Sequence, residues 1–200
     1  MNHPNNSRKE PLVILLVGLP GTGKTTLAKR LATDLEMSVI GKDEIKELLF
    51  DTLGWKDREW SVKLGAASFE LLYLLIEKML AARSSFIVDA DFSNPSYASR
   101  RLTEIFERCP CCVRQIELAC DGSVLFERFK ERSIGGTRHP GHVDNLNFDE
   151  FEVALKTGRR RKLDLAGEIV EIDTSDFSAV LYEDVLAAMR RAVAGDLCKG

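Results

Sequence analysis

Apolar and polar positions follow one another along the chain in a pattern that predicts strands and helices in turn. Residues 12–17 form an unbroken apolar run, LVILLV, which is typical of a strand buried on both faces of a parallel sheet. Residues 24–36 then place Leu27, Leu31 and Leu35 four positions apart, on one face of a helix. The fold is therefore expected to begin with a buried strand followed by a helix.

The same alternation extends over the rest of the sequence. A stretch rich in Gly, Pro, His and Asn, residues 134–148, is expected to be a mobile loop that precedes a short helix. Ser123 is expected to cap the helix before this loop. Further strands are expected at 37–40, 85–90, 111–118 and 168–173, and further helices at 42–53, 60–83, 96–108, 123–133 and 178–194.

Strands that alternate with helices indicate an α/β fold with helices on both faces of a parallel sheet. We expect three layers, a five-stranded and mainly parallel sheet, and the fold of P-loop NTPases with a lid insertion. Residues 1–11 are expected to be a flexible tail, and residues 12–200 one domain with its lid at about 132–149.

The turn between the first strand and its helix reads GLPGTGKT and fits the pattern G-x-x-x-x-G-K-[ST]. Glycines let the backbone curl so that several N–H groups point at anionic oxygens, and the helix N-terminus adds its positive end. Lys24 is expected to bridge terminal phosphates, and the Thr25 hydroxyl to bind Mg²⁺. The expected binding set for ATP and Mg²⁺ is Gly18, Pro20, Gly21, Thr22, Gly23, Lys24, Thr25 and Thr26.

Two acids at the ends of expected strands are candidates for chemistry. Asp43 follows the second strand and could accept the proton of an attacking hydroxyl, or it could simply cap the helix that begins at Glu44. Asp89 ends the third strand in a Walker-B-like arrangement and could hold Mg²⁺, directly or through water. Asp91 is the weaker candidate because it lies farther from the strand end, where ligands gather.

Two arginines, Arg128 and Arg132, precede the glycine-rich loop and lie four positions apart, on one face of a helix. They could stabilise the charge of a transferring phosphoryl group. The alternative is a solvated helix face on which they pair with Glu127 and Glu131.

These motifs together resemble the small P-loop kinases of the polynucleotide kinase, zeta-toxin and small-metabolite kinase group, with the bacterial AAA_33 type among them. The resemblance covers most of residues 12–175. It implies that KDE places the general base on Asp43, and that Lys46, where the family often has arginine, contacts the acceptor. The acid in DADFSNP maps to Asp89. The implied catalytic residues are Lys24, Asp43, Arg132 and, as second candidate for the lid arginine, Arg128; the metal ligands are Thr25 and Asp89; the substrate contacts are Asp43, Lys46 and Asp89.

The expected activity is transfer of the γ-phosphoryl group of ATP to a hydroxyl of a small-molecule acceptor. A 5′-hydroxyl end of nucleic acid is the other acceptor considered, because RRRK at 159–162 could follow a phosphate backbone. A nucleoside monophosphate kinase and a P-loop NTPase or switch without a hydroxyl acceptor remain alternatives. A GTPase is disfavoured because the sequence has no N/T-K-x-D motif. The lid segment RHPGHVD carries His139 and His142, which either touch substrate or are polar lid residues.

Composition limits the choice of partner and compartment. The formal net charge of −3 argues against a general duplex binder. No stretch has the roughly 18 apolar residues that a membrane span needs, and the polar start has no signal-peptide pattern, so a cytoplasmic protein without a membrane partner is expected. Five cysteines, without a secretion signal, favour reduced thiols; CPCC at 109–112 lacks the second ligand block of a zinc site. The oligomeric state is left open.

Overall fold

The fold is a single five-stranded sheet in which every neighbouring pair of strands runs parallel. The structure is a computed structural model that describes residues 10–136, 138–144 and 148–194. The strand order is β2-β3-β1-β4-β5. The strands are β1 (Leu12–Gly18), β2 (Ser38–Gly41), β3 (Phe86–Asp89), β4 (Cys112–Ala119) and β5 (Glu168–Asp173). The expected α/β fold with a parallel five-stranded sheet is confirmed.

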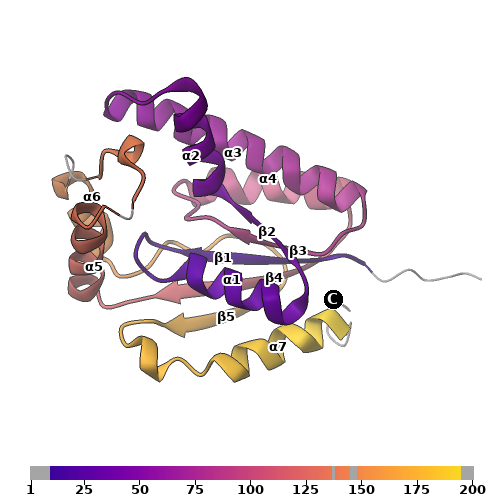
Figure 1. Ribbon diagram of the computed structural model, residues 1–200. Coiled ribbons are helices and arrows are strands. Elements are labelled where there is room, and N and C mark those ends of the chain that lie inside the picture. Colours follow the sequence, from indigo (N-terminus) through magenta and orange to yellow (C-terminus); the bar gives the residue numbers. More distant parts are fainter. Residues whose placement is uncertain (1–9, 137, 145–147, 195–200) are drawn as a thin grey trace, which may run out of the picture.

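Helices connect the strands and cover both faces of the sheet, which makes three layers (Figure 1). A short 3-10 turn lies in the region expected to be a lid, and another precedes the last helix. The helices are α1 (Lys24–Leu35), α2 (Lys42–Leu53), α3 (Arg58–Ala81), α4 (Pro95–Arg108), α5 (Gly122–Ile134), η1 (Pro140–His142), α6 (Phe148–Lys156), η3 (Phe177–Ala179) and α7 (Tyr182–Ala194).

The central strand β1 divides the core into two halves. Val13 and Leu15 belong to the buried cluster that contains side chains of α3 and α4, whereas Ile14 and Leu16 belong to the cluster that contains side chains of α1 and α7. All four side chains are fully buried. Successive side chains of a strand point to opposite faces, so an unbroken apolar run fits a strand that is covered on both sides.

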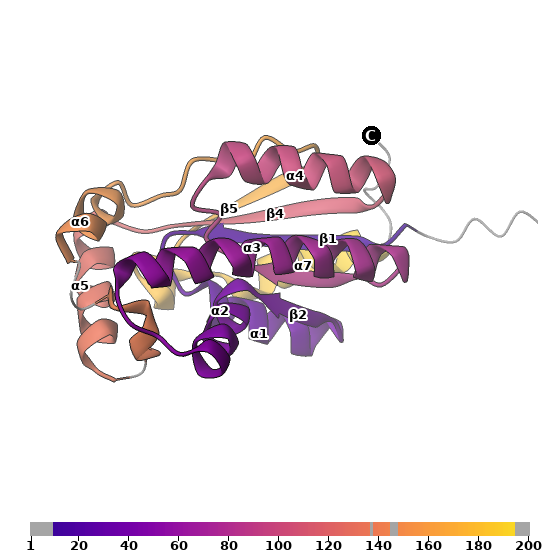
Figure 2. The same cartoon turned by 90° about the horizontal axis from the view of Figure 1, so that it is seen from above.

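A third, smaller core lies at the carboxyl end of the sheet, where α5 and α6 pack together (Figure 2). Its buried side chains include Leu19, from the turn after β1, and Phe129, from α5. This core attaches α5 and α6 to the end of the sheet where ligands bind in parallel α/β folds.

Two details of the local structure differ from the sequence-based predictions. The cap of α5 is Asp121, not Ser123: the Asp121 carboxylate accepts hydrogen bonds from the backbone N–H groups of Ser123 and Val124. Helix α3 begins at Arg58, before the predicted residue 60, because Asp57 caps it and accepts from Trp60 N–H.

The described residues of the predicted loop and tail also hold more structure than expected. Residues 140–142 form the 3-10 turn η1. Residues 137 and 145–147 of the expected lid, and residues 1–9 of the expected tail, lie outside the described residues. The carbonyl of Pro11, at the end of the expected tail, accepts a hydrogen bond of 2.9 Å from Cys112 N–H.

The cysteines form no metal centre in the described part of the chain, where no cluster of three potential ligands occurs. Cys109, Cys111 and Cys120 are free thiols, as expected, but Cys112 is disulfide-bonded, so the prediction of reduced thiols is wrong for that residue. Among the described helices, none combines the length and apolar character that crossing a bilayer requires.

Candidate functional site

The turn that follows β1 is a tight glycine-containing loop that closes on the carbonyl of Leu19. Gly21 and Gly23 have φ angles of 91° and 86°, in the left-handed region that favours glycine. At Gly23 an added Cβ would lie 2.7 Å from the Phe177 ring. The carbonyl of Leu19 accepts hydrogen bonds of 2.9 Å from both the Thr22 hydroxyl and Lys24 Nζ. The loop thus ends at α1 with the buried Lys24 ammonium beneath it.

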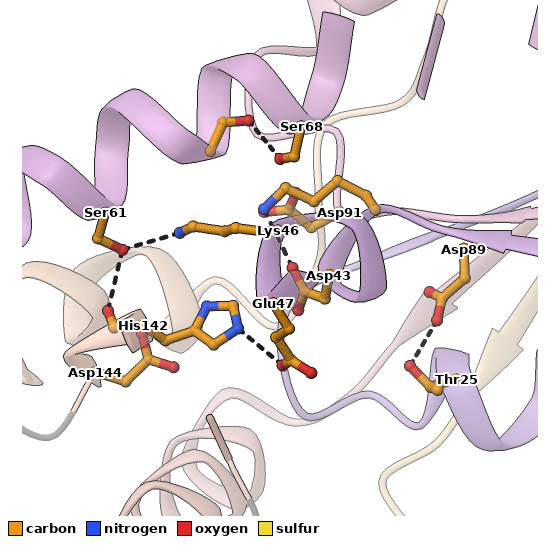
Figure 3. Close-up of polar contacts among 12 residues, drawn as sticks. Thr25, Asp43, Lys46, Glu47, Ser61, Ser68, Asp89, Asp91, His142 and Asp144 are labelled. Atoms are coloured by element: carbon orange, nitrogen blue, oxygen red, sulfur yellow. Dashed lines mark hydrogen bonds and ion pairs between the residues drawn. The ribbon is translucent and has the colours of Figure 1, made fainter. Parts of the chain in front are cut away.

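Thr25 and Asp89 meet beside this loop. The Thr25 hydroxyl donates to Asp89 Oδ2 at 2.5 Å (Figure 3). Burial raises the pKa of Asp89, against the opposing effect of the Lys24 ammonium and the Thr25 hydrogen bond. Burial likewise lowers the pKa of Lys24. A hydroxyl and a carboxylate placed together are the oxygen ligands that Mg²⁺ prefers, so these two residues fit a magnesium site.

Asp43 lies in the first turn of α2 without capping it. The N-cap is Gly41, and no side chain caps the helix. Asp43 Oδ1 accepts from Lys42 Nζ at 3.1 Å, and Oδ2 accepts from Arg138 Nη1 at 2.7 Å. Burial alone would raise the pKa of Asp43, but these two cations outweigh it and hold the pKa well below its usual value. Asp43 is therefore an ionised carboxylate that points into the site.

Lys46 is buried one turn farther along α2. Its Nζ donates to Ser61 Oγ of α3 at 3.0 Å (Figure 3). Burial and the neighbouring Lys42 lower its pKa to about 8. Lys46 therefore lies in the wall of the site between α2 and α3, one helical turn from Asp43.

The two arginines of α5 differ sharply in their surroundings. Arg128 donates to the carbonyls of Thr174 and Ser175 at 2.7 and 2.9 Å, and its guanidinium lies 4.0 Å from the centre of the Phe177 ring. Arg132, by contrast, has buried Nε and Nη2 atoms that no described residue hydrogen-bonds. Buried donors are normally satisfied, so Arg132 is the arginine with capacity for an anionic ligand.

The described residues of the expected lid, 138–144, form an ion-pair network that the sequence did not reveal. Arg138 links Asp43 to Asp144, since its Nε donates to Asp144 Oδ2 at 2.9 Å. Its Nη2 lies 3.1 Å from His142 Nδ1. His142 is buried, and its Nε2 lies 2.9 Å from Glu47 Oε1 (Figure 3). The only sequence signal for these contacts was the basic and polar character of RHPGHVD.

One cleft of about 1090 Å³ joins these groups. Lys24, Asp43 and Arg132 line it, and so do the other site residues predicted from the sequence, except Gly18 and Thr22. Most of the remaining lining comes from α3, the β3–α4 turn, the described residues of the expected lid and α6.

The basic run at 159–162 is divided between two environments. Arg160 lines the cleft and donates from Nη2 to Asp91 Oδ2 at 3.1 Å. Lys162 pairs instead with Glu117 and Glu171 on the neighbouring strands. Two of the four basic side chains thus have carboxylate partners, which weakens the case for a continuous phosphate track.

Comparisons with known proteins agree with this geometry. The family model AAA_33, described as an AAA domain, matches residues 13–176. A crystal structure of a candidate kinase from Chloroflexus aurantiacus J-10-fl is 33% identical, with a TM-score of 0.86 over 92% of this chain and 98% of that one. A search of the curated proteins gives no match.

More distant solved structures share the fold. A gluconokinase from Sinorhizobium meliloti 1021 is 16% identical, with a TM-score of 0.56 over 95% of this chain and 99% of that one. A sugar kinase from Janibacter sp. HTCC2649 is 15% identical, with a TM-score of 0.54 over 90% of this chain and 92% of that one.

Proposed function

The chain belongs to the AAA_33 family, within the small P-loop kinase group, and we propose that it transfers the γ-phosphoryl group of ATP to a hydroxyl of a small-molecule acceptor. One observation carries the proposal. The cleft places an ionised carboxylate, Asp43, and an arginine with unsatisfied buried donors, Arg132, on the same cavity as the phosphate-binding loop. A kinase needs these parts together: a phosphate cradle, cations for the moving charge and a carboxylate for the acceptor.

Each residue has a role that follows from its position. The backbone N–H groups of the loop and the start of α1 would hold the phosphates, and Lys24 and Arg132 would stabilise the charge of the phosphoryl group. Thr25 and Asp89 would hold Mg²⁺, which supplies charge neutralisation when bound. Asp43 would accept a hydrogen bond from the acceptor hydroxyl, orient it and take its proton.

A small acceptor suits the walls of this cleft. Arg58 of α3 forms a two-point ion pair with Glu150 of α6, with Nε 2.7 Å from Oε2. The described residues of the expected lid lie against α2, and Arg138, His142 and Asp144 line the same cleft as Arg58 and Glu150. A polymer needs an open groove with free cations along it, whereas Arg58 and Arg138 are paired with carboxylates within the protein.

The proposal is tested by ³²P transfer from [γ-³²P]ATP with Mg²⁺. One acceptor pool holds sugars, nucleosides and aminoglycoside-like alcohols, and the other holds 5′-hydroxyl DNA and RNA oligomers. Label in the first pool is the expected result. Label only on oligomers would make the protein a polynucleotide kinase. Release of phosphate with neither pool labelled would contradict a hydroxyl acceptor among these classes.

Replacement of Asp89 by Asn should weaken nucleotide binding only when Mg²⁺ is present. The amide cannot supply the negative charge of the carboxylate, and we expect a loss of about 10–100-fold in affinity. Calorimetry with a non-hydrolysable ATP analogue, with Mg²⁺ and with EDTA, measures both cases. Asp184→Asn, an exposed site on α7, is the matched control. Equal losses with and without Mg²⁺ would contradict the metal role.

A further inference from the structure

The side of α2 that faces residues 138–144 carries three carboxylates at four-residue spacing, and each one has an arginine or histidine partner among those residues. Asp43 accepts from Arg138. Glu47 and Asp51 pair with the two lid histidines: Glu47 Oε1 lies 2.9 Å from His142 Nε2, and Asp51 Oδ1 lies 3.1 Å from His139 Nε2. Residues four apart lie on one face of a helix, so the three pairs form one row.

Apolar contact supports the same row. The ring of Phe50 stacks on His139 at a centroid distance of 5.2 Å and meets His142 edge-on at 5.3 Å. Gly141 lies directly against Phe50, because an added Cβ would come within 2.6 Å of the ring. The lid residues therefore fit α2 closely, and only glycine is tolerated at the point of contact.

The hydrogen bonds of His142 specify its protonation state. Arg138 Nη2 is a donor, so the facing Nδ1 must accept, which leaves Nε2–H to donate to Glu47. Burial lowers the pKa of His142, in agreement with a neutral ring. A neutral His142 thus accepts a hydrogen bond from Arg138 and helps to orient it, while Arg138 remains the donor to Asp43 Oδ2.

We propose that Arg138 is the positioning residue of Asp43, and that docking of residues 138–144 on α2 brings it there. The inference rests on the proposed function, in which Asp43 receives the acceptor hydroxyl. Arg138 spans two carboxylates, Asp43 and Asp144, which fixes its guanidinium plane and with it the Oδ2 side of Asp43. Lys42 holds Oδ1, so Asp43 has one orientation in the docked lid.

The charged groups around Asp43 predict in which direction its pKa changes when Arg138 is removed. The facing cations are Lys24 of α1, Lys42 and Lys46 of α2, Arg132 of α5, and Arg138. The facing acids are Glu47, Asp89 and Asp144, and His142 also titrates. The ordinary pKa is 3.8. The docked arrangement lowers the pKa of Asp43. The stability that the ionised carboxylate gives to this arrangement is therefore fully present above pH 3.8, and it is lost as the pH falls through the lowered pKa. Without Arg138 this carboxylate should titrate at higher pH.

Selective ¹³C labelling of aspartate carboxyls tests the proposal without any acceptor. The Asp43 signal is assigned by its absence in Asp43→Asn. We expect it to titrate below 3.8 in the unmodified protein, and about one pH unit or more higher in Arg138→Gln. Arg108→Gln, which removes an exposed pair with Glu77, is the matched control and should leave the midpoint unchanged. An unchanged midpoint in folded Arg138→Gln overturns the proposal.

Gly141→Ala provides a second route should Arg138→Gln fail to fold. The added methyl group blocks docking against Phe50 without removing any charge, so the Asp43 midpoint should rise as in Arg138→Gln. Exchange of the lid amides shows whether docking is lost. A displaced lid with an unchanged Asp43 midpoint overturns the proposal.

Kinetics complete the test. With an acceptor that the ³²P assay identifies, Arg138→Gln should lower kcat about 10–100-fold and leave the affinity for a non-hydrolysable ATP analogue unchanged. Equal kcat in the two proteins overturns the positioning role. If the unmodified protein labels no acceptor, the proposed function fails, while the titration still decides whether Arg138 controls Asp43.

Discussion

Lys24→Met is expected to lose about 10³-fold or more of phosphoryl transfer while the fold remains intact. The Lys24 ammonium is buried beneath the phosphate-binding loop, and its loss removes a fixed positive charge from the place where phosphate charge moves. Methionine fills a similar volume, and replacing a buried charge by an apolar side chain need not destabilise the protein. Initial rates of ³²P transfer and the melting temperature measure the two effects.

Lys29→Met is the matched control, because Lys29 lies on the exposed side of the same helix. It should transfer phosphoryl groups at the rate of the unmodified protein. Full activity in folded Lys24→Met would contradict the assignment of the loop.

Asp43→Asn is expected to lose about 10²–10⁴-fold of transfer with little change in nucleotide affinity. The amide has nearly the shape of the carboxylate, but it cannot take the proton of the acceptor and its NH₂ group faces a cation on one side. The loop, Thr25 and Asp89 are untouched, so ATP should still bind. The ratio of kcat/KM values, together with calorimetry of a non-hydrolysable ATP analogue, measures both expectations.

Asp51→Asn separates this effect from a disturbance of the lid. Asp51 pairs with His139 at the far end of the same row on α2 and does not line the cleft. We expect a much smaller change of rate in this variant. If Asp43→Asn and Asp51→Asn lose the same activity, Asp43 acts by holding the lid and not by receiving a proton.

Asp43 has two kinds of contact, and this is why Asp43→Asn is compared with Asp51→Asn. Its carboxylate belongs to an ion-pair network and also lies on the cleft of the phosphate-binding loop. A carboxylate held by two cations is a weaker base but a better fixed one. In phosphoryl transfer, positioning contributes a large part of the rate, so a strongly ionised carboxylate still suits this role.

The sequence by itself determined the fold class and the phosphate-binding loop. An unbroken apolar run, a glycine turn and a leucine-spaced helix are local patterns, and the loop residues 18–25 are contiguous, so no long-range contact is needed to predict them. Asp43 and Asp89 could also be placed, since the carboxyl ends of parallel strands meet at one edge of the sheet. The cleft brings both of them to that edge.

Only the tertiary structure decided which side chains are paired. Arg128 and Arg132 look equivalent in sequence, yet Arg128 is bound by two carbonyls some 46 residues away, and Arg132 has donors that no described residue satisfies. Arg138 meets Asp43 across 95 residues. Such pairs depend on how separate elements pack together, and the spacing of residues along the chain does not predict that packing. The pattern of residues along the chain therefore predicted the phosphate-binding loop. The packing of α5 and of residues 138–144 against the site determined which arginines lie near Asp43.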